Sequence, residues 1–235
     1  MASILALVLL SLPLTMMAES RLDLSPWYIA KALAVLCVGA ALVLQGLPAH
    51  HPFRSIGPAN LATAARGVLV ALLAALIGER ASVPAQYLVL AVGAVAAILD
   101  GVDGWLARRS NMASRFGARF DMETDALLIL TLAVLAWQFR KADLWVLLSG
   151  VLRYAFVLAS LGLPWLQAPL FPSFRRKAVA VLQTIALLAV IAPFVPHAAS
   201  APIAGLALFG LALSFLTDVV WLKRETARNT SLRAA

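Results

Sequence analysis

The chain has 235 residues, of which 63% are hydrophobic and 13% are charged, and its formal net charge is +8. A soluble core of this length cannot hide so much apolar surface, which excludes a soluble globular protein and indicates a polytopic membrane protein. The basic residues are scattered between apolar segments rather than gathered on one face. The positive charge therefore indicates membrane topology and contact with anionic lipids, and not nucleic-acid binding.

Two apolar segments come first along the chain. Residues 2–18 are typical of either a signal peptide or a retained helix, and the lack of a basic n-region and of an Ala-x-Ala site favours a retained helix. A second helix is predicted over residues 28–47, ending at Gly46 and Pro48. We expect residues 1–54 to form a hydrophobic extension of two helices.

From residue 55 onward, apolar segments recur at even intervals, and each approaches the ~20 residues that a bilayer helix needs. They cover residues 60–78, 86–108, 121–139, 144–163, 178–195 and 202–222. The predicted fold is all-α: a polytopic membrane helix bundle with six core transmembrane helices in a domain over residues 55–235, preceded by the two-helix extension.

The basic residues of the loops predict the orientation of this bundle. One set of alternate connections holds twelve lysines and arginines, and the opposite set holds four. Cytoplasmic loops are the ones enriched in these residues. We therefore expect both termini and the loop near residue 110 on the cytoplasmic side of a bacterial inner membrane.

The stretch from Asp100 to Asp125 holds five of the eleven carboxylates of the chain. Asp100 and Asp103 are three residues apart, and Asp121 and Asp125 are four apart, so each pair shares one helix face. A short basic loop joins the two helices and predicts that they are antiparallel neighbours. The four carboxylates are then expected to meet just inside the membrane.

Such a cluster needs a counter-charge, because uncompensated carboxylates repel one another and are costly to desolvate. One or two divalent cations would supply it, and oxygen ligands without nearby Cys or His favour Mg²⁺, Mn²⁺ or Ca²⁺ over zinc. Mg²⁺ sites often combine carboxylates with substrate phosphates, which predicts a phosphate-bearing substrate. The alternative is pairing of the aspartates with nearby arginines, namely Arg108, Arg109, Arg115 and Arg119.

Two other acidic residues are interpreted as structural. Glu123 lies between Asp121 and Asp125 but points to the opposite side of its helix, so it is expected to be an interfacial ion-pair partner. Asp218, near the end of the last span, is expected to reach toward Lys223 or Arg224.

Written as D-x2-D-G-x2-A-R-x8-G-x3-D-x3-D, the acidic stretch resembles the signature of the CDP-alcohol phosphotransferase family in every fixed position and spacing. These positions are Asp100, Asp103, Gly104, Ala107, Arg108, Gly117, Asp121 and Asp125. The segment Asn60-x2-Thr63-x2-Arg66 also resembles the family's first core helix, where an Asn near the helix start faces the nucleotide. The family usually has a proline directly before that Asn, whereas here Ala59 separates Pro58 from Asn60.

The resemblance implies a membrane enzyme of phospholipid biosynthesis that transfers a phosphatidyl-type group from a CDP-linked donor, CDP-diacylglycerol, to an alcohol and releases CMP. It implies two divalent ions, Mg²⁺ or Mn²⁺, held by Asp100, Asp103 and Asp121. Asp125 is implied as the catalytic base and as a ligand of the second ion. The implied nucleotide-binding residues are Asn60, Thr63, Gly104, Ala107, Arg108, Ser114 and Gly117. Homodimers are common in the family.

Three basic residues bear on the acceptor. Arg153 is the only strong base inside the span 144–163, and an arginine within hydrocarbon indicates a functional site. Arg175 and Lys177 open the next helix. Relatives with phosphorylated acceptors have bases at comparable places, which implies glycerol 3-phosphate, inositol phosphate or a similar polyol. An amino alcohol or lipid acceptor, and a purely topological role for the bases at 175–177, remain alternatives.

Two other classes of membrane protein use intramembrane aspartates. A cation-coupled carrier would place them at the bilayer midplane, between broken helices at matched positions of two halves. An aspartate-rich enzyme of the prenyltransferase type would carry separate acidic clusters on helices that are not adjacent. The carboxylates of this chain instead crowd one interface and one helical hairpin, which favours the CDP-alcohol enzyme.

Overall fold

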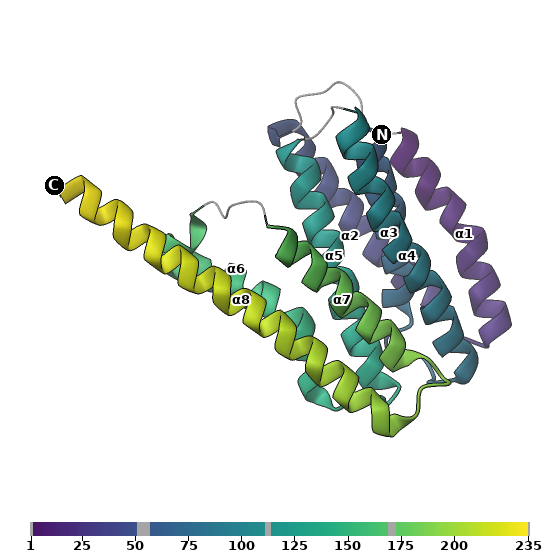
Figure 1. The fold of residues 1–235 in the computed structure, drawn as a ribbon. Coiled ribbons are helices and arrows are strands. Elements are labelled where there is room, and N and C mark those ends of the chain that lie inside the picture. Colours follow the sequence, from purple (N-terminus) through teal and green to yellow (C-terminus); the bar gives the residue numbers. More distant parts are fainter. Residues whose placement is uncertain (1, 51–56, 111–113, 169–172, 235) are drawn as a thin grey trace.

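The computed structural model describes residues 2–50, 57–110, 114–168 and 173–234, and within these ranges the fold is all-α, as predicted (Figure 1). The α-helices are α1 (Ala2–Leu22), α2 (Trp27–His50), α3 (Pro58–Ala75), α4 (Val83–Ser110), α5 (Arg115–Gln138), α6 (Leu148–Gly162), α7 (Phe174–Ile191) and α8 (His197–Ala234). Two short 3-10 helices flank α6, namely η1 (Leu144–Leu147) and η2 (Pro164–Gln167).

The two N-terminal helices form where the apolar segments predict them, but α2 continues to His50. The predicted end at Gly46 and Pro48 is therefore wrong. A proline removes one backbone hydrogen bond from a helix, and close to the helix end few such bonds are left to lose.

Helices α3 to α8 take the places of the six predicted core helices. Four helical stretches of the described chain are long and apolar enough to cross a membrane: Pro58–Ala75, Val83–Ala107, Leu144–Gly162 and His197–Thr226. The apolar helix Trp27–Ala41 is shorter. Helices α5 and α7 lie outside this group because charged residues occupy their first turns, which shortens their apolar length.

Helix α3 is central to the bundle and packs against α1, α2, α4 and α5. Helix α7 also packs against both α4 and α5, so these two helices share α3 and α7 as neighbours. Large apolar side chains of α3 and its C-cap residue, of α5 and of α7 fill the centre: Leu73, Leu76, Leu132, Leu135, Leu187 and Ile191.

A buried carboxylate ties the N-terminal helices to the end of α3. Glu79, just after α3, is 8% exposed. It accepts hydrogen bonds from the backbone N–H of Ser25 at 2.8 Å and from the Ser25 hydroxyl at 2.7 Å, and it pairs with Lys31 of α2. Lys31 Nζ also donates to the carbonyl of Ile77 at 3.0 Å. Burial raises the pKa of Glu79, but the hydrogen bonds from Lys31 and Ser25 outweigh burial and hold it below its ordinary value.

This network predicts a pH-dependent stability. Folding lowers the pKa of Glu79 from its ordinary value of 4.5. The ionised carboxylate therefore stabilises the fold above pH 4.5, and this stabilisation is lost as the pH falls through the lower pKa of the folded state. We expect Glu79→Gln to cost about 1–3 kcal/mol at neutral pH. Thermal unfolding in detergent should show the gap to wild type narrowing below pH 4.5.

Asp143→Asn is the matched control for this comparison, since Asp143 is an exposed carboxylate whose side chain forms no capping hydrogen bond. Its stability should follow that of the wild type at each pH. A gap for Glu79→Gln that stays constant down to acid pH would contradict the stabilising role of the ionised carboxylate.

Candidate active site

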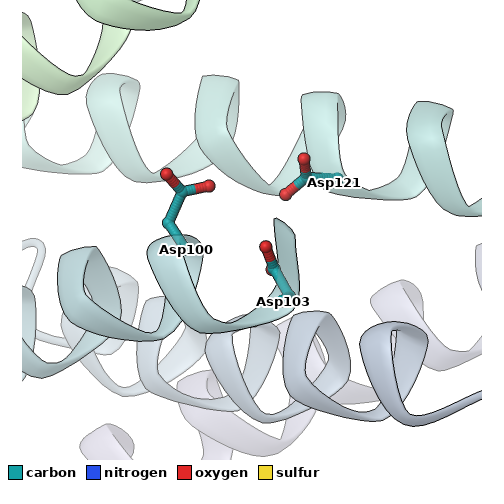
Figure 2. Close-up of side chains that lie close together, drawn as sticks. All are labelled: Asp100, Asp103 and Asp121. Atoms are coloured by element: carbon teal, nitrogen blue, oxygen red, sulfur yellow. The ribbon is translucent and has the colours of Figure 1, made fainter. Parts of the chain in front are cut away.

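The predicted carboxylates converge at one end of the bundle. Asp100 and Asp103 lie near the end of α4, and Asp121 lies in the second turn of α5. One carboxylate oxygen from each lies within 4.8 Å of the others, and Figure 2 shows the three groups turned toward one another. Asp100 and Asp103 are 7% and 3% exposed. The helical spacing of the aspartates thus correctly predicts that α4 and α5 bring them together.

A buried arginine of α3 lies among these carboxylates, which helical spacing does not predict. Arg66 is 1% exposed. Its Nη1 lies 2.7 Å from Asp103 Oδ2, 2.6 Å from Asp121 Oδ1 and 3.2 Å from Asp100 Oδ1. Its Nη2 pairs with Asp125. One guanidinium therefore faces four carboxylates, and the cluster keeps an excess of negative charge.

The residues implied to bind a nucleotide gather beside the aspartates. Thr63 Oγ1 lies 3.1 Å from Asp103 Oδ2 as a hydrogen-bond donor. The Ser114 hydroxyl caps α5 by accepting from the N–H of Gly117 at 3.0 Å. A Cβ on Gly117 would stand 2.5 Å from Asn60 Oδ1. Only glycine lets the start of α5 approach the buried Asn60 so closely.

Gly104 and Ala107, which are also implied to bind the nucleotide, are half-buried on α4 after Asp103. The side chain of Arg108 lies outside the described part of the structure.

The alternative in which loop arginines neutralise the aspartates does not hold for the side chains that are described. Arg109 lies over the ring of Trp105, 5.1 Å from its centroid, and Arg119 is exposed. The side chains of Arg108 and Arg115 are not described. The described counter-charge comes instead from Arg66, on a helix distant in sequence.

Arg153 finds its partner on the far face of α5. Arg153 Nη2 lies 2.5 Å from Glu123 Oε1, which confirms the prediction that Glu123 is an ion-pair partner. The two helices can approach because Gly150 has no side chain: a Cβ there would stand 2.5 Å from the Cα of Leu130. The charge within α6 is thus balanced across the α5–α6 contact.

Arg175 is held by α8. It donates to the Ser214 hydroxyl at 2.7 Å and pairs with Asp218 at 2.5 Å, and Arg176 lies 3.4 Å from the same carboxylate. The prediction that Asp218 reaches toward Lys223 or Arg224 is therefore wrong. Residues five and six positions along a helix point to other faces, whereas the start of α7 packs directly on α8.

The three predicted acceptor residues do not form one pocket in the described structure. Arg153 and Arg175 have separate carboxylate partners, and Lys177 is exposed on α7. None of the three forms a described hydrogen bond or ion pair with an aspartate of the cluster.

A cavity of about 20 Å³ adjoins the aspartates, which is room for one water molecule. It lies between α3, α4, α5 and α7 and is lined by Arg66, Ala97, Asp100, Asp125, Leu128, Ala180, Val181 and Thr184. Among the described buried atoms, Arg66 Nε and Asp100 Oδ1 have no hydrogen-bond partner, the latter because its 3.2 Å contact with Arg66 lacks hydrogen-bond geometry. Converging carboxylate oxygens, one of them unsatisfied, fit a hard divalent cation.

Comparison with known proteins finds a match at the level of the family. A family model described as CDP-alcohol phosphatidyltransferase matches residues 57–220. No curated protein and no solved structure matches the chain. The matched range begins at α3 and ends within α8, so it contains Arg66 and all four aspartates but neither α1 nor α2.

Proposed function

Since the chain belongs to the CDP-alcohol phosphatidyltransferase family, and is thus a transferase with membrane-crossing helices, we propose that it transfers a phosphatidyl-type group from CDP-diacylglycerol to a phosphorylated polyol. CMP is the other product. The observation that carries this proposal is the convergence of Asp100, Asp103 and Asp121 within 4.8 Å inside the matched range.

The aspartates are proposed to hold the ions of the reaction. Asp100, Asp103 and Asp121 would bind one of two Mg²⁺ or Mn²⁺ ions, and Asp125 would contribute to the second. Such ions, when bound, neutralise charge on the leaving CMP and make the lipid-side phosphorus more electrophilic.

Asp125 is the proposed base. It lies one turn beyond Asp121 on α5, and its carboxylate borders the cavity that extends to α7. It would take the proton of the acceptor hydroxyl as that oxygen bonds to phosphorus and the bond from phosphorus to CMP breaks. General base catalysis of this kind supplies roughly 10² to 10⁴ in rate.

The nucleotide is proposed to lie over the start of α5. Buried Asn60 and the capping Ser114 meet there at Gly117, and Thr63 orients Asp103 by its hydrogen bond. The remaining proposed contacts come from the end of α4: Gly104, Ala107 and Arg108.

This placement predicts that Gly117→Ala weakens nucleotide binding. The added methyl would stand 2.5 Å from Asn60 Oδ1 and must displace that side chain. We expect the Kd for CMP, measured by calorimetry with Mg²⁺ present, to rise about tenfold. Gly67→Ala on α3 is the control, because its Cβ would meet no atom within 4 Å. Equal affinities for both variants would place the nucleotide elsewhere.

The acceptor is proposed to approach from α7. The cavity beside Asp125 is lined by Ala180 and Val181, about one turn beyond Lys177. Lys177 is exposed and would bind an acceptor phosphate directly, whereas Arg175 and Arg153 would first have to release Asp218 and Glu123. Ammonium and guanidinium donors suit a phosphate dianion.

We also propose six core membrane crossings by α3 to α8, with α1 and α2 as an N-terminal extension and the aspartates on the cytoplasmic side of a bacterial inner membrane. Figure 1 supports a common side for the start of α1 and the aspartates, since the start of α1 lies at the same end of the bundle as the end of α4. A homodimer is the proposed assembly, on the resemblance to the family alone.

The function is tested by CMP release from CDP-diacylglycerol. The purified protein in detergent is given Mg²⁺ or Mn²⁺ and one acceptor at a time: glycerol 3-phosphate, inositol phosphate, an amino alcohol or a lipid alcohol. Release that requires a phosphorylated polyol is the expected result. Release of CMP with only an amino alcohol or a lipid alcohol would overturn the proposal of a phosphorylated polyol as acceptor. If the folded protein releases no CMP with any of these acceptors, the proposed transferase reaction is wrong and a cation-coupled carrier is favoured.

A further inference from the structure

Arg66 occupies the place in the aspartate cluster where a metal ion would lie. The three carboxylate oxygens that approach one another within 4.8 Å come from Asp100, Asp103 and Asp121. Arg66 Nη1 lies within 3.2 Å of an oxygen of each of these residues. Oxygen ligands stand about 2.0–2.6 Å from Mg²⁺ or Ca²⁺. A nitrogen at these distances leaves no room for an ion bound to the oxygens that it contacts.

We propose that Arg66 is the internal counterion of the ion-free enzyme and that its guanidinium withdraws when a divalent ion binds. The inference rests on the proposed function, because only that function requires the ion. In the ion-free chain, Arg66 offsets part of the repulsion among the four carboxylates. Its single charge leaves them in excess, so the cluster still attracts a doubly charged ion.

The position of Arg66 favours exchange over permanent pairing. Its Nε is buried without a hydrogen-bond partner, so the guanidinium is not fully satisfied among the carboxylates. The adjoining cavity, which Arg66 itself lines, has room for one water molecule on the side of α7. A small displacement of the guanidinium in that direction meets the least packed part of its surroundings.

Metal affinity without substrate tests the exchange. Mn²⁺ is titrated by calorimetry into wild type, Arg66→Gln and Arg66→Lys. Because glutamine removes the competing charge, we expect Arg66→Gln to bind Mn²⁺ at least about tenfold more tightly than wild type. Lysine keeps the competing positive charge, so Arg66→Lys should bind Mn²⁺ within about threefold of wild type.

Lys31→Gln is the matched control. It removes the cation of another partly buried ion pair, with Glu79, at a site whose partners do not include the aspartates. Its affinity for Mn²⁺ should equal that of the wild type. Thermal unfolding adds a second readout: the rise in Tm from chelator to Mn²⁺ should be larger for Arg66→Gln than for wild type and Lys31→Gln.

Arg66→Gln that binds Mn²⁺ as weakly as wild type, or more weakly, would overturn the proposal. If this variant folds only with Mn²⁺ present, competition with a chelator measures its affinity. Arg66→Lys that binds tenfold more tightly than wild type would also overturn it. Wild type that binds no divalent ion and releases no CMP would instead refute the proposed function. Wild type that binds Mn²⁺ and releases CMP, without tighter binding by Arg66→Gln, would refute the exchange alone.

Discussion

Asp121→Asn is expected to lower CMP release at least about a thousandfold. The substitution keeps the shape of the side chain but removes one of the three converging carboxylates. It also removes the charge that lies 2.6 Å from Arg66 Nη1, so the arginine would be held less centrally among the remaining aspartates. Steady-state release of CMP from CDP-diacylglycerol at saturating Mg²⁺ measures the loss.

Glu123→Gln is the matched control, because Glu123 lies two residues further on the same helix but pairs with Arg153 on the opposite face. Its substitution removes none of the three converging carboxylates. We expect its kcat to stay within about threefold of wild type. Asp121→Asn that keeps a tenth of the activity would remove this aspartate from the mechanism, and an equal loss in both variants would indicate disruption of α5.

Removal of divalent ions is expected to abolish turnover and leave the protein folded. Activity should fall to the uncatalysed background in excess chelator and return with Mg²⁺ or Mn²⁺, since no described residue other than the aspartates is placed to hold an ion at this site. The fold should survive because Arg66 still pairs with the carboxylates. CMP release and thermal unfolding, measured on the same chelated sample, check both parts.

Two outcomes would contradict this expectation. Full activity in chelated protein would exclude an ion from the reaction. Unfolding of the chelated protein, with no refolding on addition of Mg²⁺, would show that Arg66 does not compensate for the missing ion.

Spacing alone was enough to predict the acidic half of the site. Asp100 and Asp103, like Asp121 and Asp125, are separated by about one helical turn, and this period fixes the face on which each pair lies. The same reasoning placed Glu123 on the other face, where it meets Arg153. Helix periodicity is local, so these relations survive any error in how the helices pack.

The remaining features depend on which helices become neighbours, and periodicity does not encode that choice. Arg66 lies three residues after Thr63 in the sequence, but its contacts with the aspartates depend on the packing of α3 against both α4 and α5. Sequence proximity predicts Lys223 or Arg224 as the partner of Asp218, whereas the contact of α7 with α8 pairs it with Arg175 and Arg176. Pairing of Glu79 with Lys31 likewise requires the ends of the first three helices to meet.

The pairing of charges between helices bears on how the chain enters the bilayer during synthesis. Glu123 and Arg153 neutralise each other across α5 and α6, and Arg175 and Asp218 do so across α7 and α8. On translocon scales, a charge on a lone inserting helix costs up to about 2.5–3.5 kcal/mol, the value at the bilayer centre. Lateral release of each hairpin as a unit avoids exposing either charge alone to lipid, so biogenesis of this bundle is favoured to proceed by pairs of helices.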